Sequence, residues 1–204
     1  MPSYASAREL MDAVMARYRA LPDYSDRGFV TARRRGRDHV IAFETAYEAS
    51  GDFRFTFDRP HPYRPLRHMV TRFVVGRRGG EAYLDRRASD GDVSTQVEPD
   101  FNLAIAGATG TSYGAAHTIA GLLFPEVTGW SFRELKRPRL RSPQLIDGVW
   151  CHRITGLQHR ARMVIHVGVE DLLIRRIAHR RPGSEERRLD VRVSAPLSEA
   201  PRPS

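Results

Sequence analysis

The sequence predicts a mainly β fold of the α+β class, in which a strongly curved antiparallel sheet or an incomplete barrel is covered by an N-terminal helix and by mid-chain helices. Three observations lead to this prediction. Apolar residues recur with a helical period only near the start of the chain. Over most of the rest they recur with a two-residue period between glycine-containing turns. A Gly- and Ala-rich segment in the middle separates two runs of such hairpins.

The first expected element is an amphipathic helix. Ser6 followed by Glu9 fits a capping box, and an apolar stripe occupies one helical face over residues 10–18. Pro22 cannot continue the hydrogen-bond ladder and disfavours helical geometry at Leu21. The helix should therefore end before residue 22.

A run of hairpins is expected from residue 28 onward. Its clearest strand is 53–58, FRFTFD, in which three phenylalanines point to one face and three polar residues point to the other. A slip of one residue would expose all three rings, so the pairing register should be strongly specified. The strands expected in this run are 29–33, 40–48, 53–58, 69–75 and 81–86, with turns near Gly36, Gly51, Pro60 and Gly79-Gly80.

The two-residue alternation stops between residues 100 and 135. Residues 115–124 predict a helix that Pro125 ends and that lies as a cover across the open face of the sheet. A second run of hairpins follows, with strand centres at 140, 149–154, 163–169, 172–179 and 189–193 and turns at 147–148, 170–171 and 182–183. We assign residues 1–195 to a single domain and expect residues 196–204 to form a disordered tail.

The composition limits the functions open to this chain. Cys151 is its only cysteine, which excludes an intramolecular disulfide and a multi-cysteine metal site. The net charge of +9 favours anionic partners, such as lipid head groups, nucleic acid or an acidic protein. No apolar run approaches the roughly 18 residues of a membrane-spanning helix, so none is expected.

The motif with the sharpest enzymatic association is GTSYG at residues 110–114, which fits the G-x-S-x-G pattern of a serine elbow. That elbow requires a buried parallel strand before the serine, whereas hairpins surround this segment. We therefore expect a loop into the next helix, with Ser112 as a cap. The histidines are scattered outside metal-binding spacings, and His117 lies among apolar helix residues as a packing group. We assign no catalytic residue, no metal site and no cofactor.

Six segments carry a resemblance to a known group of families. They are the opening helix LMDAVMARYRALPDYSDRG, the strand FRFTFDRPHPYR, the hairpin FVVGRRGGEAYL, the mid-chain helix GTSYGAAHTIAGLLFP, the strand IDGVWCHRITG and the late pair MVIHVGVEDLLIRRIA. Their order resembles the bacterial lipoprotein carriers and receptors of the LolA/LolB type and their outer-membrane lipoprotein-sorting relatives.

The resemblance implies an incomplete antiparallel barrel closed by helices, with an apolar cavity that binds acyl or other lipid-like ligands without catalysis. In such carriers an arginine holds the covering helices closed, and Arg54, Arg64 and Arg72 are candidates for this role. Exported carriers have a signal peptide, and the anchored receptor has an acylated cysteine near its mature start. Neither is visible here, and Cys151 lies deep in a predicted strand. The expected location is the periplasm or cell envelope if an export signal was removed, and the cytoplasm otherwise.

The candidates for lining the hydrophobic cavity come from the predicted strands and from the mid-chain helix. A packed core without a cavity would use the same alternation, and the chain would then be an interaction module. The cavity-lining candidates are Phe43, Phe53, Phe55, Phe57, Phe73, Leu122, Leu123, Phe124 and Trp150.

A competing function is that of a small cyclase or isomerase acting on a hydrophobic substrate in the same cavity, for which Asp58, Glu81 and Asp85 are available carboxylates. Arginines at the strand ends predict a solvated rim, which also suits an anionic head group or an anionic membrane surface. Nucleic acid is disfavoured, because the rings of strand 53–58 point away from Arg54 instead of lining a basic groove with it. The sequence leaves the oligomeric state open.

Overall fold

The computed structural model describes residues 4–34, 37–61, 66, 68–128, 134–158, 161–180 and 188–193. Within them the chain forms three helices and eleven strands. In chain order these are α1 (Ala7–Arg19), β1 (Asp23–Arg34), β2 (Arg37–Glu48), β3 (Phe53–Pro60), β4 (Val70–Arg78), β5 (Glu81–Ala88), β6 (Val93–Glu98), α2 (Phe101–Thr109), α3 (Ala115–Leu123), β7 (Lys136–Ile146), β8 (Val149–Gln158), β9 (Ala161–Gly168), β10 (Ile174–Arg180) and β11 (Arg188–Val193).

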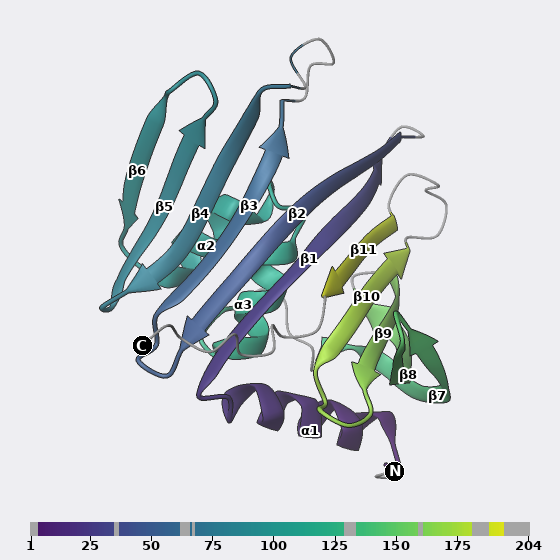
Figure 1. The fold of residues 1–204 in the computed structure, drawn as a ribbon. Helices are drawn as coiled ribbons and strands as arrows, with labels where there is room; N and C mark the ends of the chain where they lie inside the picture. Colours follow the sequence, from purple (N-terminus) through teal and green to yellow (C-terminus); the bar gives the residue numbers. More distant parts are fainter. Residues whose placement is uncertain are drawn as a thin grey trace, which may run out of the picture.

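The described strands belong to one antiparallel sheet (Figure 1). Its strand order is β6-β5-β4-β3-β2-β1-β11-β10-β9-β8-β7, so neighbours in the sheet are also neighbours in the chain except where β1 pairs with β11. That pairing joins the two runs of hairpins. β6 and β7 form the two edges, which leaves the sheet open in the way that an incomplete barrel requires.

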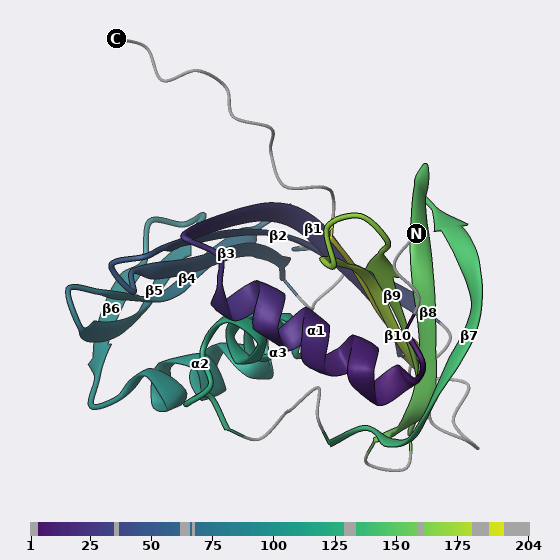
Figure 2. The ribbon, with the colours of Figure 1, turned by 90° about the horizontal axis from the view of Figure 1, so that it is seen from below.

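The sheet arches over the helices (Figure 2). α2 packs against β4, β5 and β6, whereas α1 contacts both α3 and β7. This curved antiparallel sheet with helices on its concave side confirms the predicted fold class. In the described part of the chain, no helix combines the length and the apolar character that crossing a membrane requires.

α1 forms as its sequence predicts. The Ser6 hydroxyl accepts a hydrogen bond from the Glu9 amide at 3.2 Å, and the Glu9 carboxylate accepts one from the Ala5 amide at 2.8 Å. These bonds satisfy amide groups that a helix N-terminus leaves without intrahelical partners. The apolar stripe from Leu10 to Tyr18 is buried, and the helix ends at Arg19.

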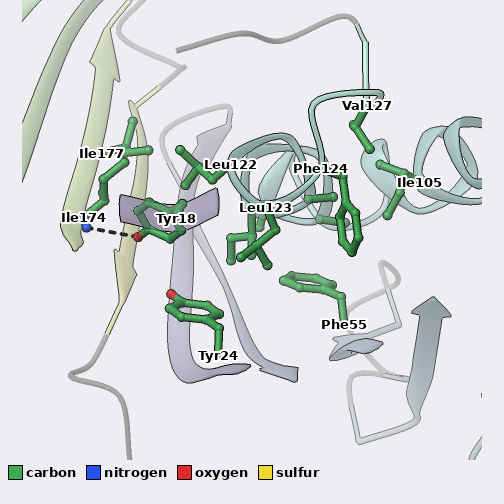
Figure 3. Packing of buried hydrophobic residues seen from close by; sticks show 14 of the residues in the cluster. Tyr18, Tyr24, Phe55, Ile105, Leu122, Leu123, Phe124, Val127, Ile174 and Ile177 are labelled. Carbon is green, nitrogen blue, oxygen red and sulfur yellow. Dashed lines mark hydrogen bonds between the residues drawn. The ribbon is translucent and has the colours of Figure 1, made fainter. Parts of the chain in front are cut away.

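Three side chains of α1 tie the helix to backbone groups in the second half of the chain. The Tyr18 hydroxyl accepts a hydrogen bond from the Ile174 amide at 3.0 Å (Figure 3). Arg8 Nη2 donates to the Leu135 carbonyl at 3.1 Å, and Arg17 Nε donates to the Asp171 carbonyl at 3.3 Å. α1 therefore fastens the N-terminus across the C-terminal strands.

The inner face of the sheet is aromatic where β2, β3 and β4 meet. Phe53, Phe55 and Phe57 are fully buried, whereas Arg54 between them is exposed on the outer face. The Phe55 ring stacks on Phe43 of β2 with centroids 5.2 Å apart. Burying three rings stabilises the sheet by roughly 5–9 kcal/mol in gross transfer energy, which opposes any slip in register.

Three elements differ from those expected. β1 begins at Asp23 instead of residue 29, because Asp26 and Gly28 interrupt the apolar alternation on its inner face. β6 is almost wholly exposed and so carries no apolar pattern. α2 lacks a polar face, but the Asp100 carboxylate caps it by accepting a hydrogen bond from the Leu103 amide at 2.9 Å. The turns expected at residue 36 and at 182–183, and the tail 196–204, lie outside the described residues.

Replacing Phe55 with alanine should lower the free energy of unfolding by about 3–5 kcal/mol, because the lost ring leaves a cavity between β2 and the covering helices. Trp150, which is 55% exposed, serves as the control. Trp150→Ala should cost about 1 kcal/mol or less. Urea denaturation followed by circular dichroism measures both values, and equal losses would contradict the packing described above.

Candidate ligand site beneath the helical cover

The predicted cavity-lining residues converge between the sheet and a helical cover, which we define as α2, α3 and the segment 124–128 that follows them. Phe43, Phe53, Phe55 and Phe57 from the sheet are buried in one cluster with Leu122, Leu123 and Phe124 from the cover. Figure 3 shows Phe55 facing the cover at Leu123 and Phe124. Phe73 is half-buried and packs against this cluster, its ring stacked on Phe57 with centroids 5.0 Å apart.

Trp150 is the exception among these candidates. It lies on the same face of β8 as the buried Ile154, but next to the Asp147-Gly148 turn, and it is 55% exposed. Its register partner on β7, Leu145, is also exposed. The expectation that Trp150 lines the interior is therefore wrong, because the strand carries its side chain past the end of the buried cluster.

Edge-to-face contacts between aromatic rings join the end of the cover to the sheet. Phe124 packs edge-on against Phe53 of β3 and Phe101 of α2, with centroids 5.4 and 5.0 Å away. Tyr47 of β2 approaches Phe124 in the same manner at 5.4 Å. Such T-shaped pairs contribute about 0.5–1.5 kcal/mol each beyond the area that they bury. The end of the cover is thus anchored by aromatic groups.

The two cover helices themselves are short and rich in alanine. Each has nine residues, and neither contains Asp, Glu, Lys or Arg. Short helices of this length gain most of their stability from tertiary packing. Alanine buries little apolar surface, so the cover depends on its few large side chains. Its buried alanines are Ala104, Ala108, Ala115, Ala116 and Ala120.

Arg77 joins the sheet to the cover. It lies at the inner end of β4, opposite Phe53, and its guanidinium sits 4.7 Å from the Phe124 ring centroid and 5.2 Å from that of Phe101. Its Nη1 forms an ion pair with Glu126 Oε1 at 3.1 Å. Its Nε donates to the carbonyl of Gly51, a turn residue with φ of 90°. One cation therefore contacts α2, the segment after α3 and the β2–β3 turn.

Neither of the two described arginines considered from the sequence, Arg54 and Arg72, occupies this position. Arg54 and Arg72 project from the outer face, where Arg72 forms two hydrogen bonds to Asp58 at 2.7 and 2.8 Å. Arg64 lies outside the described residues. The signal for Arg77 is the alternation Phe73, Val75, Arg77, which continues the inner face of β4 two residues beyond the strand end expected at residue 75.

A second group missed by sequence reasoning is a buried carboxyl on the inner face of β1. Asp26 is only 1% exposed, and its carboxylate accepts a hydrogen bond from the Tyr24 hydroxyl. Burial raises the pKa of Asp26 to about 6, against the lowering effect of that hydrogen bond. The Tyr24 ring lies 5.7 Å from that of Tyr18, and both tyrosines belong to the same buried cluster as the cover residues Leu122 and Leu123. Burial also raises the pKa of both tyrosines.

The serine and histidine of the mid-chain segment have structural roles. Ser112 is fully buried and its hydroxyl accepts a hydrogen bond from the Ala116 amide at 3.3 Å, although the N-cap residue of α3 is Gly114 and not Ser112 as expected. His117 Nε2 hydrogen-bonds to the Thr128 carbonyl, and the Thr128 amide donates to Asn102 Oδ1 at 3.0 Å. These bonds fasten the segment after α3 back to both cover helices.

A groove of about 580 Å³ lies on the outer face of β2–β6, on the side of the sheet away from the cover. Arginines and carboxylates are mixed along it, around the half-buried ring of Tyr83. It is therefore distinct from the apolar site expected beneath the helices. Its lining residues are Glu44, Arg54, Thr56, Arg72, Val74, Arg78, Glu81, Tyr83, Asp85, Arg87, Thr95 and Val97.

The sequence matches no protein-family model and no curated protein. Solved structures nevertheless share the fold. LprF from Mycobacterium bovis is 12% identical and superimposes with a TM-score of 0.54 over 97% of this chain and 96% of its own. A putative outer membrane lipoprotein-sorting protein domain from Vibrio parahaemolyticus is 7% identical, with a TM-score of 0.38 over 92% of this chain and 89% of its own. A LolA superfamily protein from Nitrosomonas europaea is 8% identical, with a TM-score of 0.36 over 97% of this chain and 96% of its own.

At these identities the likeness concerns the fold and not the residues of a site. The match to LprF extends over nearly the whole of both chains, so the open sheet and its helical cover form one shared architecture. The chain therefore shares the fold of LprF, an open curved sheet with a helical cover.

Proposed function

We propose that this protein binds and carries a hydrophobic ligand, such as an acyl chain, between the inner face of the sheet and the helical cover, without catalysis. One observation carries the proposal. The aromatic face formed by Phe53, Phe55 and Phe57 is closed by two short helices that have no charged residue and whose buried residues include five alanines. A surface of this kind offers an acyl chain the same apolar environment that it offers the cover.

Uptake of a ligand requires part of the cover to move away from the sheet. Each buried methylene of an acyl chain contributes about 0.8 kcal/mol, so a long chain offsets the loss of several ring and alanine contacts. The contacts to be broken are concentrated at Phe124 and Arg77. We therefore assign the entrance to the side of the cover that Arg77 closes.

The fold likeness and the resemblance of the sequence to LolA-type carriers both support this function. The same resemblance supports a location in the periplasm or cell envelope, where carriers of that type act. The exposed arginines of the chain suit an anionic head group at the mouth of the site. The ligand class follows from the chemistry of β3, whose inward residues Phe53, Phe55 and Phe57 are apolar rings.

The direct experiment uses palmitic acid carrying a diazirine group near the end of its chain. After irradiation, peptide mass spectrometry should locate the label on β3 and on the cover, at Phe53, Phe55, Leu122, Leu123 or Phe124. Native mass spectrometry of the unlabelled complex gives the stoichiometry. Failure to take up the fatty acid, or label confined to the outer groove around Tyr83, would refute the proposal.

Replacing Arg77 with methionine should loosen the cover without unfolding the sheet. Two cation–π contacts and one ion pair contribute about 1–2 kcal/mol together, so local opening should become roughly ten times more frequent. Hydrogen exchange at residues 101–128 and the rate of palmitate uptake should both increase by about that factor. Arg78→Met is the matched control, since Arg78 is the next residue of β4 and lies exposed on the outer face. Equal acceleration in both variants would show that Arg77 does not hold the cover.

Asp26 keeps a second function open, that of a small cyclase or isomerase acting on the same hydrophobic ligand. A buried carboxyl whose pKa is raised to about 6, hydrogen-bonded to Tyr24, has the properties of a general acid or base. The two functions differ in the fate of the ligand. A carrier returns its ligand with mass and chromatographic behaviour unchanged, whereas an enzyme returns a product that the Asp26→Asn variant does not form.

The raised pKa of Asp26 also predicts how stability depends on pH. The folded protein binds this proton more tightly than the unfolded chain, whose aspartate has its ordinary pKa of 3.8. The contribution of this bound proton to the free energy of unfolding is fully present below about pH 4. It is lost as the pH rises through about 6, and the loss amounts to up to about 3 kcal/mol. The Asp26→Asn side chain cannot ionise. Between pH 4 and pH 7 the free energy of unfolding of this variant should therefore rise, relative to that of the wild type, by up to that amount. Urea midpoints at the two pH values measure the change, and an unchanged difference would show that Asp26 does not titrate in this range.

A further inference from the structure

The charges of this protein are distributed unevenly over its sheet. The strands β7, β8, β9 and β10 contain no aspartate or glutamate, although they carry eight arginines. The strands β1 to β5 carry both signs, and ion pairs such as Arg27–Glu44 and Arg72–Asp58 form on their outer face. The net charge of +9 is thus concentrated on the C-terminal half.

Within that half, basic residues lie opposite one another across successive strands. The register pairs Arg141 with Arg153, Arg153 with His166, and His166 with Arg176. The alternate positions Ile154 and Ile165 belong to the buried core, so this row lies on the outer face. Strands are about 4.8 Å apart, which sets the spacing of the row.

Further basic residues extend this surface to either side of the row. We define the basic face as the outer side of β7–β10 and name it by its exposed or half-buried cations. They are Lys136, Arg139, Arg141, Arg153, Arg162 and Arg176.

Arg141 and Arg153 are like charges directly opposite each other on neighbouring strands, an arrangement that is destabilising. The buried Nε of Arg153 has no hydrogen-bond partner among the described residues. An external anionic partner would offset the repulsion between these two arginines.

We propose that the basic face docks on the surface of an anionic lipid bilayer. The face is on the convex side of the arch, opposite the helices, so a broad and gently curved surface can touch it (Figure 2). Leu157, next to Arg162 in register, is 36% exposed and adds an apolar contact. The cations spread over four strands, which matches an array of head groups better than one strand of nucleic acid held in an aromatic groove.

Docking through this face goes beyond the carriage of a ligand. The helical cover lies on the other side of the sheet, so the surface that meets the membrane and the proposed ligand site remain separate. Ligand binding and membrane binding can therefore be measured independently. Loss of one does not require loss of the other.

The test compares the full chain with two triple variants by co-sedimentation with vesicles. The vesicles contain either phosphatidylcholine alone or phosphatidylcholine with phosphatidylglycerol. The basic-face variant is R139Q/R141Q/R162Q, in which all three side chains are exposed. The matched control is R54Q/R78Q/R87Q, which removes the same charge from exposed positions on the outer face of β3–β5.

The wild type and the control variant should bind the phosphatidylglycerol vesicles, and should bind pure phosphatidylcholine much more weakly. The basic-face variant should bind about 100-fold less tightly, because each cation near an anionic membrane contributes about 1 kcal/mol, or about fivefold. Binding should also weaken in 0.5 M salt. Thermal melting provides the folding check, and the basic-face variant should melt at or above the wild-type temperature once repulsion is relieved.

Three results would overturn the proposal. They are absence of binding to anionic vesicles, equal losses in the two triple variants, and equal binding to neutral and anionic vesicles. A fourth measurement uses a single-stranded oligonucleotide. If it binds the wild type, if the basic-face variant abolishes that binding and if vesicles do not compete, the face serves nucleic acid and the membrane proposal is wrong.

Discussion

The aromatic inner face of β2–β4 has to be kept from water, and much of the architecture follows from this constraint. Phe43, Phe53, Phe55 and Phe57 form one apolar surface on a sheet whose edges do not meet. A closed barrel would fill its own interior. An open one needs other elements on its concave side, and here three helices supply them (Figure 2).

Polar groups at the margins of this interior decide how firmly the cover is held. Arg77 binds the cover from one side through rings and through Glu126. Tyr18 holds α1 on the other side by its hydrogen bond from Ile174. Between them Asp26 remains buried at the cost of a raised pKa. Hydrogen bonds and one cation therefore act together with the aromatic contacts of Phe124 at the margins of the interior.

Local rules with a strong physical basis allowed much of the fold to be predicted from the sequence. The Ser6 cap and the stripe up to Tyr18 specify α1, and the FRFTFD alternation specifies the face that β3 buries. β6 and α2 were not predicted, because β6 buries almost nothing and α2 has no polar face. For these two elements the sheet register and the contact with β4 and β5 decide the conformation.

The candidate site was predictable in its apolar part and not in its polar part. Alternation identifies the inner phenylalanines, but it assigns Trp150 to the same face without indicating where the cover ends. Arg77 and Asp26 are polar residues at inward positions, and their partners Glu126 and Tyr24 become neighbours only in three dimensions or through strand geometry. In a sequence pattern such residues are breaks in the apolar alternation, whereas in the fold they form an ion pair or a hydrogen bond with a residue of the interior.

The position of the single cysteine has a practical consequence. Cys151 is fully buried on β8, and burial raises the pKa of its thiol to about 11, so alkylating reagents find neither access nor thiolate in the native state. Its rate of modification then reports how often β8 separates from its neighbours. Because the chain has no other thiol, that signal comes from one known place. The natural sequence thus contains a probe of conformational opening in its C-terminal half, with no label to be engineered.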